Sequence, residues 1–519
     1  MTTIYLAEIS AHDGTSALTL RYSSGVGYSD PSAPGFYEPR ILQPLSLRRT
    51  AFGSGTTGGA IQVGIGELIL TNADGGLDAL LGYGFDGRRL AVLIGDDRAA
   101  YSTFTTVFVG TMEQPAFEFS KVSILARDRL AELERKPANA TKYAGSNALP
   151  NGLEGVPGDL QGRPKPRVYG RVLNVAPPMV NSSRLIYQIN DGAVQDVPNV
   201  YDRGLGLTKG TDYTSQSDME TTAPAAGNYR VWPAGGYFRL GSTPAGLITA
   251  DVTQGATTAA RTAAQVLQAL ATGPGGIAGG DVVSGDVTAL DTANGAELGI
   301  WIADETSVRA VMETVANSIG AWFGFDRLGR LRMVRLTAPT GSPVATLRYL
   351  TAGAVADATT ADIVSIERVP ANDRGAGVPS HRAILSYQRN HSVQPTDLAG
   401  AVTAARREFL KLEYRTVIST DASVLTKHLL AGERAFESLV LDATAAQTEA
   451  DRLRDLFKVR RDRLRVVVKW DASLAAVVDL GSVVSVAIPR FGYDAGRLFV
   501  VIGIENDAAN DTAELELWG

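Results

Sequence analysis

Short apolar runs separated by turn residues characterise the first quarter of the chain. Runs of roughly four to eight residues with this spacing are typical of strands in β-sandwiches and barrels. The intervening turns, such as 72–76, contain Asn, Asp and Gly, which tolerate the left-handed backbone of tight turns. The pattern predicts strands at 3–9, 16–22, 60–70, 89–94, 103–109 and 116–125.

Apolar residues at helical spacing predict a small number of helices. The strongest stripe is Val308, Val311, Met312, Val315 and Ile319. The predicted helices are 128–134, 259–271, 305–319 and 445–460.

Residues of the types that cap helices stand at the ends of three of these segments. Asp128 is the expected N-cap of the first helix, and Asp304 that of the third. Gly320 is expected to end the third helix. Thr444 and Gln447 have the spacing of a capping box for the fourth.

The later parts of the chain return to strand patterns. Further strands are predicted at 167–172, 185–189, 237–240, 321–325, 330–336, 482–488, 497–504 and 512–518. The stretches 138–159 and 272–294 are rich in Gly, Pro or Asn, which favours a linker and a loop. The predicted fold is mainly β with some α, in several domains. The expected division is a first β-domain at 1–145, an inserted β-rich domain at 146–300, and an α+β region at 301–519 with a C-terminal β-meander.

Length and composition support a folded chain of several domains. The 519 residues are 45% hydrophobic and 20% charged, which excludes a mainly disordered protein. The formal net charge of -6 argues against a strongly basic nucleic-acid binder. A basic run at 458–463 follows a predicted helix, where the helix dipole favours cations.

The absence of cysteine removes several kinds of chemistry together. Disulfides, thiolate zinc sites, cysteine-ligated iron–sulfur clusters and cysteine nucleophiles are all excluded. The first ten residues lack the basic and apolar regions of a signal peptide, and no apolar run reaches 18 residues. We therefore expect neither a secretion signal nor a membrane span.

Motifs for catalysis or cofactor binding are weak. The glycines of 82–87 match G-x-G-x-x-G, but a strand pattern follows where a dinucleotide site needs a helix. The four histidines, His12, His381, His391 and His428, have no metal-ligand spacing. We predict no catalytic residue, no metal and no cofactor. Paired carboxylates of a glycosidase are an alternative, because their spacing is spatial rather than sequential.

Five aromatic residues in the middle of the chain are candidates for ligand or partner contact. Aromatic rings on loops can stack against sugars or a protein surface, and they can equally fill a small β-core. We favour the core interpretation and keep a carbohydrate-binding module as an alternative function. The five residues are Tyr201, Tyr213, Trp232, Tyr237 and Phe238.

Three stretches resemble a family of tail proteins from long-tailed bacteriophages and from prophages of proteobacteria. The first is Leu153-Glu154-Gly155 with 158–170, GDLQGRPKPRVYG. The second is 185–188, LIYQ, with 200–204, VYDRG. The third is 497–504, RLFVVIGI, with the closing 515–519, LELWG. The resemblance extends over most of the chain, but its motifs are structural and none indicates an activity.

The resemblance implies a role and an assembly. These proteins are similar in role to the baseplate hub of contractile tails and to the N-terminal part of the host-specificity protein of lambda-like phages. A homotrimer with two tail-tube-like β-barrels per subunit would match a six-fold tail tube to a three-fold tip, with roles in host attachment and DNA ejection. The implied partners are a distal tail-tube ring protein, other tail-tip and fibre proteins, and the tape measure protein or DNA passing through the lumen without specific binding.

The same resemblance implies a location and marks two departures. The protein would be part of the virion tail, assembled in the cytoplasm of the host bacterium. The chain of 519 residues lacks the long C-terminal fibre part of the lambda-like protein, which puts direct receptor binding in doubt. It also lacks the cysteines with which some tail-tip proteins hold an iron–sulfur cluster, so no cluster is expected.

Overall fold

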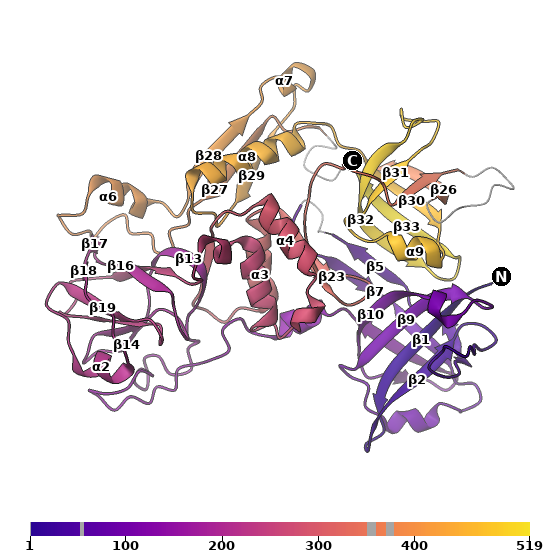
Figure 1. Ribbon diagram of the computed structural model, residues 1–519, viewed down its shortest axis with the longest axis horizontal. Helices are drawn as coiled ribbons and strands as arrows, with labels where there is room; N and C mark the ends of the chain where they lie inside the picture. The colour runs from indigo at the N-terminus through magenta and orange to yellow at the C-terminus, as the bar shows by residue number, and fades with distance from the viewer. Residues whose placement is uncertain (1, 52–56, 350–359, 370–377) are drawn as a thin grey trace.

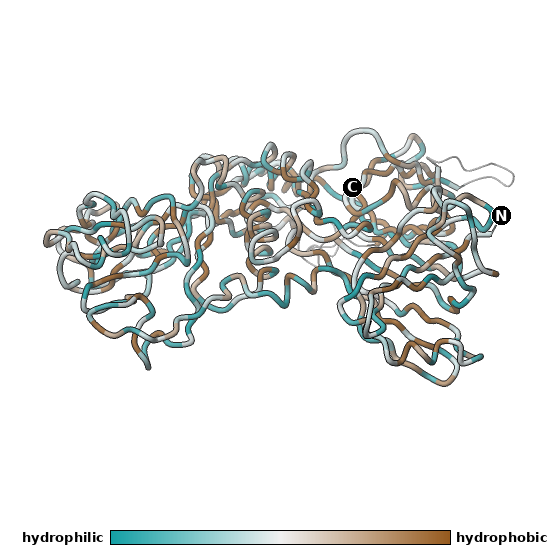
Figure 2. Tube along the Cα trace, turned by 60° about the horizontal axis from the view of Figure 1, so that its bottom comes forward, coloured by the Kyte–Doolittle hydropathy of each residue, from teal (hydrophilic) through white to brown (hydrophobic). Residues whose placement is uncertain are grey.

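The computed structural model describes residues 2–51, 57–349, 360–369 and 378–519. The molecule is elongated, with a β-rich part at one end, helices in the centre and two β-rich units at the other end (Figure 1). Hydrophobic stretches follow the strands and the central helices (Figure 2).

A nine-stranded sheet contains the N-terminal strands. β1 (Thr3–His12) pairs antiparallel with β2 (Ala17–Ser23) on one side and with β9 (Arg89–Asp96) on the other. Alternate residues of β1 enter the main core on one face and a small aromatic cluster on the other, so the strand is buried on both faces. The other strands are β3 (Glu38–Pro39), β4 (Ile41–Gln43), β8 (Glu67–Thr71), β10 (Thr105–Met112), β11 (Ala116–Phe117) and β12 (Lys121–Arg127).

A closed six-stranded barrel forms from the last third of the chain, in the order β31-β25-β26-β30-β33-β32 and back to β31. Within this ring of six strands, closure leaves no unpaired end strand. The strands are β25 (Ala345–Arg348), β26 (Thr360–Val369), β30 (Arg463–Lys469), β31 (Val483–Val486), β32 (Arg497–Asp507) and β33 (Thr512–Trp518).

Two strands from the first third of the chain extend this barrel. β5 (Leu47–Thr50) pairs with β32, and β7 (Gln62–Ile65) pairs with β5. Helix α9 (Ala472–Val477) packs against β9 and β10 of the nine-stranded sheet. The Thr105 hydroxyl donates to the Ala472 carbonyl at 2.9 Å. The two large β-units are therefore joined by strands and by a helix.

The middle of the chain forms two five-stranded sheets around a separate apolar cluster. One sheet contains β13 (Arg167–Val175), β16 (Asp196–Asp202), β17 (Leu205–Gly206), β21 (Ile248–Thr253) and β22 (Gly299–Ile302). The other contains β14 (Met179–Asn181), β15 (Ile186–Gln188), β18 (Thr208–Lys209), β19 (Asn228–Trp232) and β20 (Tyr237–Leu240). Helix α2 (Gln216–Thr221) packs beside β19.

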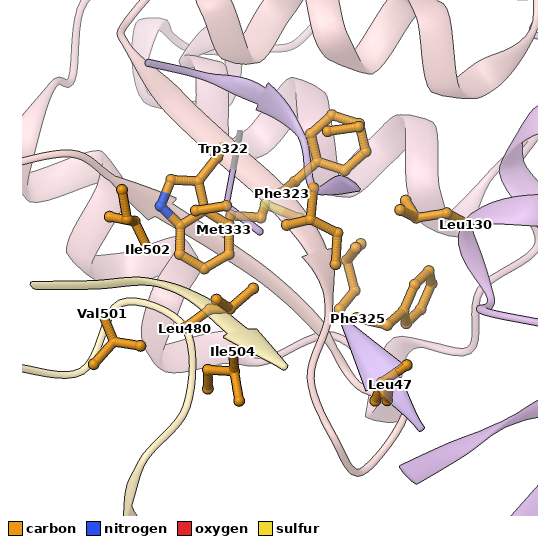
Figure 3. Close-up of a cluster of buried hydrophobic side chains, with 14 of the residues drawn as sticks. Leu47, Leu130, Trp322, Phe323, Phe325, Met333, Leu480, Val501, Ile502 and Ile504 are labelled. Atoms are coloured by element: carbon orange, nitrogen blue, oxygen red, sulfur yellow. The ribbon is translucent and has the colours of Figure 1, made fainter. Parts of the chain in front are cut away.

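The centre of the molecule combines helices with a short sheet, β24-β23-β6. Every residue of β23 is buried, and Trp322, Phe323 and Phe325 lie among side chains from the barrel and from the N-terminal strands (Figure 3). The elements are β6 (Gly59–Ala60), β23 (Ala321–Phe325), β24 (Leu331–Arg335), α1 (Leu130–Arg135), α3 (Ala263–Thr272), α4 (Ser284–Ala293) and α5 (Val308–Asn317).

A three-stranded sheet projects from the body beside helix α8 (Ala443–Phe457), which packs on β27 and β28. Phe436 and Phe457 stack between the sheet and the helix. The strands are β27 (Arg382–Tyr387), β28 (Arg415–Thr420) and β29 (Glu433–Glu437). Helix α6 (Ala404–Lys411) precedes β28, and helix α7 (Val424–Lys427) lies at the outer end of the sheet (Figure 1).

The predicted fold class, mainly β with some α, is confirmed, and the four predicted helices are present as α1, α3, α5 and α8. Three predicted N-caps are wrong. Arg129 rather than Asp128 stands at the N-cap of α1, where no side chain makes a cap hydrogen bond. Ser307 rather than Asp304 caps α5, and Asp442 rather than Thr444 caps α8, because their side chains reach backbone amides in the first turn. Gly320 adopts the left-handed conformation, φ +61°, expected after a helix.

Two predicted segments differ in the structure. The single strand expected at 60–70 is three strands in three sheets, because the chain changes sheet at Ile61 and again at Gly66. At Gly66 a Cβ would lie 2.1 Å from the Ser46 hydroxyl. The loop expected at 272–294 includes helix α4, whose Val287 and Leu290 enter the main core. Tertiary burial there outweighs the weak local preference of a Gly- and Thr-rich sequence.

The division of the chain at 145 and 300 stays a prediction, and several contacts cross it. β5 and β7 come from the first third yet extend the barrel of the last third. α3 and α4 precede residue 300 and share the main core with α5.

The core around β23 predicts a large cost for truncating its aromatic residues. Phe323 is fully buried, so Phe323→Ala should lower the free energy of unfolding by about 3–5 kcal/mol, measured by chemical denaturation. The matched control is Phe119→Ala, whose side chain is 99% exposed and should change stability by less than about 0.5 kcal/mol. Equal effects of the two substitutions would contradict this account of the core.

Candidate functional site

The five aromatic residues that were candidates for ligand or partner contact do not form one exposed platform. Tyr213, Tyr237 and Phe238 are buried, whereas Tyr201 and Trp232 are partly exposed. Burial explains the first three as core residues. Contact of Tyr201 or Trp232 with a ligand or partner stays a prediction.

Each buried ring has a specific partner. Phe238 stacks on Tyr187 with a centroid distance of 5.2 Å, and Tyr237 stacks on Trp232 at 5.7 Å. The Tyr213 hydroxyl donates to the Thr222 carbonyl at 2.8 Å. Phe238 belongs to the cluster between the two five-stranded sheets, while the others line a second cluster near the 138–159 segment.

Tyr201 belongs to a polar cluster at the place where the middle sheets meet residues 388–414. We call this cluster the junction network; its members are Asn174, Asn199, Tyr201, Asp251, Asn390 and Arg406. The Tyr201 hydroxyl donates to Asp251 Oδ2 at 3.0 Å, and the Arg406 guanidinium lies 3.7 Å from the Tyr201 ring centroid. Asp251 is buried and also accepts from the Asn174 backbone N–H at 2.8 Å and from Asn199 Nδ2 at 3.0 Å. The Asp251 carboxylate therefore accepts three hydrogen bonds in a buried place, where water could not easily replace a lost donor.

Two asparagines complete the junction network. Asn174 adopts a left-handed backbone, φ +55°, and its Nδ2 donates to Asn390 Oδ1 at 2.7 Å. Its Oδ1 accepts from Arg406 Nη2 at 2.6 Å. Asn390 is 1% exposed and donates to carbonyls at the end of α6. The network thus clamps α6 onto β13, β16 and β21 through side chains from four separate segments.

The electrostatics of the junction network suit a structural clamp better than acid–base chemistry. Burial, and then the charge of Asp251, raises the pKa of Tyr201 far above its ordinary value, so the phenol stays a donor. Burial lowers the pKa of Arg406 from that of a free guanidinium. Neither group titrates near neutral pH, where a general acid or base would need its pKa.

His391 lies beside the junction network with its ring buried against β13. Its Nδ1 lies 3.3 Å from the Leu173 carbonyl, and its Nε2 has no hydrogen-bond partner among the described residues. Burial first, and then the Arg389 charge, lower the pKa of His391 to about 4. The imidazole is therefore neutral in the folded chain at pH 7.

Other candidate chemistry is not assembled by the fold. Within the described ranges, no three His, Cys, Asp or Glu side chains are grouped as a metal site. The glycines of 82–87 lead into strand β9, so the dinucleotide motif lacks its helix. The basic run at 458–463 follows α8, and Lys458 there pairs with Asp421 and Asp455. None of the helices in the described segments has the length and hydropathy needed to cross a bilayer.

Sequence analysis missed the junction network because its members are distant in the chain. Asn174 is 216 positions from Asn390 and 232 from Arg406. Isolated Asn, Asp and Arg residues are ordinary surface residues in a sequence, and only the fold buries them together.

Comparisons with known proteins give weak structural likenesses. No family model matches the chain, and no curated protein matches its sequence. A tail protein from Neisseria meningitidis MC58 aligns with a TM-score of 0.42 and 10% identity over 99% of this chain and 96% of that one. The 43 kDa tail protein of prophage MuSo2 from Shewanella oneidensis aligns with a TM-score of 0.40 and 11% identity over 99% and 98%.

A chain from the virion of a native gene transfer agent particle aligns with a TM-score of 0.42 and 16% identity, over 69% of this chain and 84% of that one. The TM-scores of these three likenesses lie below 0.5. They establish neither a shared fold nor a shared function for this chain.

The junction network predicts that one arginine holds two parts of the molecule together. Arg406→Ala leaves Asn174 Oδ1 without its charged donor and uncovers Tyr201, so stability should fall by about 2–3 kcal/mol. Hydrogen exchange should accelerate in both 388–414 and the facing residues of β13 and β21. The matched control is Arg407→Ala, because the hydrogen bonds of the Arg407 side chain to described residues all go to carbonyls of residues 399–402. In Arg407→Ala, faster hydrogen exchange should be confined to residues 388–414. If exchange in β13 and β21 accelerated as much as in Arg406→Ala, the clamp would be contradicted.

The pKa of His391 predicts acid sensitivity. Its folded-state pKa of about 4 lies below the ordinary value of 6.5, so the unfolded chain binds a proton more readily between these values. The free energy of unfolding should therefore fall by about 2 kcal/mol as the pH is lowered from 7.5 to 5, because the unfolded chain gains a proton on His391 that the folded chain does not. Urea unfolding at several pH values should show a smaller loss of stability in His391→Gln. The control variant His428→Gln should lose as much stability as the wild-type chain. An unchanged pH dependence in His391→Gln would refute this assignment.

Proposed function

We propose that this chain is a structural protein of a bacteriophage tail, the hub subunit of the tail tip or baseplate. The observation that carries the proposal is the closed six-stranded barrel joined to a nine-stranded sheet. A subunit with two large β-units matches the two tube-like domains that the sequence resemblance implies. Three such subunits would present six β-units to a six-fold tail tube.

The physical properties of the barrel suit assembly. The six barrel strands pair around the full circumference, which limits unwanted strand pairing with other copies, and the extension leaves β7 as an end strand. The extension by β5 and β7 ties the barrel to the nine-stranded sheet, and both units share one apolar core. Each subunit of a symmetric ring would then present the two β-units together.

The inserted sheets give the hub an outward arm. They lie at the far end of the elongated molecule from the barrel (Figure 1). The junction network holds this arm through α6, and we propose that the arm contacts neighbouring tail-tip or fibre proteins. Division at 145 and 300 would then separate the ring-forming body from the arm.

The proposed partners follow from the hub role. Two further copies would complete a homotrimer, and a distal tail-tube ring protein would dock on the six β-units. The tape measure protein or DNA would pass through the lumen without specific binding. The protein would act in the virion, in host attachment and DNA ejection, after assembly in the cytoplasm of the host bacterium.

Particle stoichiometry tests the hub role directly. Reconstruction of intact tails that contain this chain should give three equivalent copies around the tail axis. One copy, or six equivalent copies, would refute the trimeric hub.

The purified chain should leave peptidoglycan suspensions turbid and release no reducing sugar, whereas clearing or sugar release would favour the glycosidase alternative.

A further inference from the structure

Asn151 and Gly152 lie at the tip of a loop between α1 and β13. Backbone hydrogen bonds of 2.9–3.0 Å join 145–147 to 154–155, so the loop folds back on itself. The Asn151 N–H closes the tip by donating to the Ala148 carbonyl at 3.1 Å. The Asn151 side chain is exposed, so solvent water reaches its amide.

Asn181, at the end of β14, fixes the backbone on both sides of Asn151. Its Nδ2 donates to the Pro150 carbonyl at 3.0 Å and to the Gly152 carbonyl at 2.8 Å, and the residue is buried. Gly152 has φ +103°, and a Cβ there would lie 2.4 Å from Asn147 Oδ1, so a side chain at this position would clash. The backbone around Asn151 is therefore held in a defined shape.

Arg184 places a positive charge on the side-chain carbonyl of Asn151. Arg184 Nη2 donates to Asn151 Oδ1 at 2.7 Å, and Arg184 Nε donates to the Pro150 carbonyl at 2.8 Å. The planar guanidinium is thus anchored at two points of the loop tip. It polarises the Asn151 amide, because a charged donor draws electron density toward the oxygen and leaves the amide carbon more open to attack.

A second arginine, Arg239, lies near Arg184, and neither forms an ion pair with an acidic side chain among the described residues. The hydrogen bonds of the two side chains go to uncharged oxygens of Pro150, Asn151, Met219 and Glu220. Burial first, and the Arg184 charge to a lesser degree, lower the pKa of Arg239. The loop tip therefore lies in a positive field, which would stabilise a negative charge formed on Asn151.

The Gly152 nitrogen is free to act as a nucleophile. Its N–H has no hydrogen-bond partner among the described residues, whereas the Gly152 carbonyl is held by Asn181. The nitrogen directly follows the Asn151 backbone carbonyl, so its attack on the side-chain amide carbon of Asn151 closes a five-membered ring. Glycine presents no Cβ to crowd that attack.

We propose that Asn151 is a self-modifying residue, whose side-chain amide is converted to a carboxylate by the Gly152 nitrogen with the help of Arg184. The Gly152 nitrogen loses its proton to solvent hydroxide and attacks the Asn151 side-chain carbonyl carbon. The new C–N bond closes a succinimide ring, and the amide nitrogen takes a proton from water and leaves as ammonia. A water molecule then opens the ring to aspartate or isoaspartate. No atom is oxidised or reduced, so solvent is the only co-reactant.

Arg184 acts on the transition state of the ring closure. Attack makes the Asn151 side-chain carbon tetrahedral and places negative charge on its oxygen, the atom that Arg184 Nη2 already contacts. A donor placed on a developing oxyanion lowers the barrier to its formation. The carboxylate formed at the end would pair with the same guanidinium, which has no other anionic partner among the described residues. The modification would then replace a neutral hydrogen bond at the loop tip by an ion pair.

Asn294 and Gly295 form the other Asn-Gly pair of the sequence and give an internal comparison. Asn294 Oδ1 accepts from the uncharged Ala296 N–H at 3.1 Å, so its carbonyl lacks a charged donor. The two pairs have the same covalent chemistry. A difference between their rates therefore reports the surroundings that the fold gives to each pair.

The rates of the two Asn-Gly pairs in the purified full-length chain test the proposal. Peptide mass spectrometry after incubation at mildly alkaline pH should show deamidation about tenfold faster at Asn151 than at Asn294. Unfolding in urea should bring the two rates together, because it separates Arg184 from Asn151. Equal rates in the folded chain, or a difference that persists after unfolding, would overturn the proposal.

Substitution of Arg184 tests the group that promotes the reaction. Arg184→Gln should slow deamidation at Asn151 about tenfold in the folded chain and leave the rate at Asn294 unchanged. Arg184→Lys, which keeps the charge, should slow it less. The matched control is Arg163→Gln, an exposed arginine of the same loop, which should leave both rates unchanged.

Circular dichroism and melting confirm that each variant is folded. A loop that Arg184→Gln merely loosened would react faster rather than slower. A rate at Asn151 that stays the same or rises in Arg184→Gln would therefore overturn the role of Arg184.

Discussion

The pairing of β5 with β32 is the contact on which the body of the molecule depends. It joins residues 47–50 to residues 503–506, so two ends of the chain share one sheet. The Leu47 N–H donates to the side chain of Asn506, 459 positions away. Because β5 also leads through β7 and β8 into the nine-stranded sheet, loss of this pairing would remove the strand connection between the two large β-units. Buried Arg49 reinforces it by pairing with Asp479 at 2.8 Å.

Two kinds of joint hold the molecule together. The body is joined by apolar packing around β23, where aromatic side chains meet residues from the barrel and from the N-terminal strands. The arm is joined to α6 through the polar junction network, whose stability depends on hydrogen-bond geometry rather than on area. A polar joint of this kind specifies one orientation, because any shift leaves buried groups unpaired. The arm is therefore held in one orientation relative to α6.

The candidate site was only partly predictable from the sequence. Tyr201 was singled out as an aromatic, but its role depends on Asp251 and Arg406, which no local pattern marks.

The sequence by itself determined the mainly β class, most strands and the four principal helices, since alternation and helical spacing are local properties. It also excluded thiol chemistry, because cysteine is absent. Only the tertiary structure decided that 60–70 divides among three sheets and that α4 is helical. It also decided that strands from the first third extend the sheet of the C-terminal barrel. These outcomes depend on contacts between residues hundreds of positions apart, and their free energy exists only once the chain has folded.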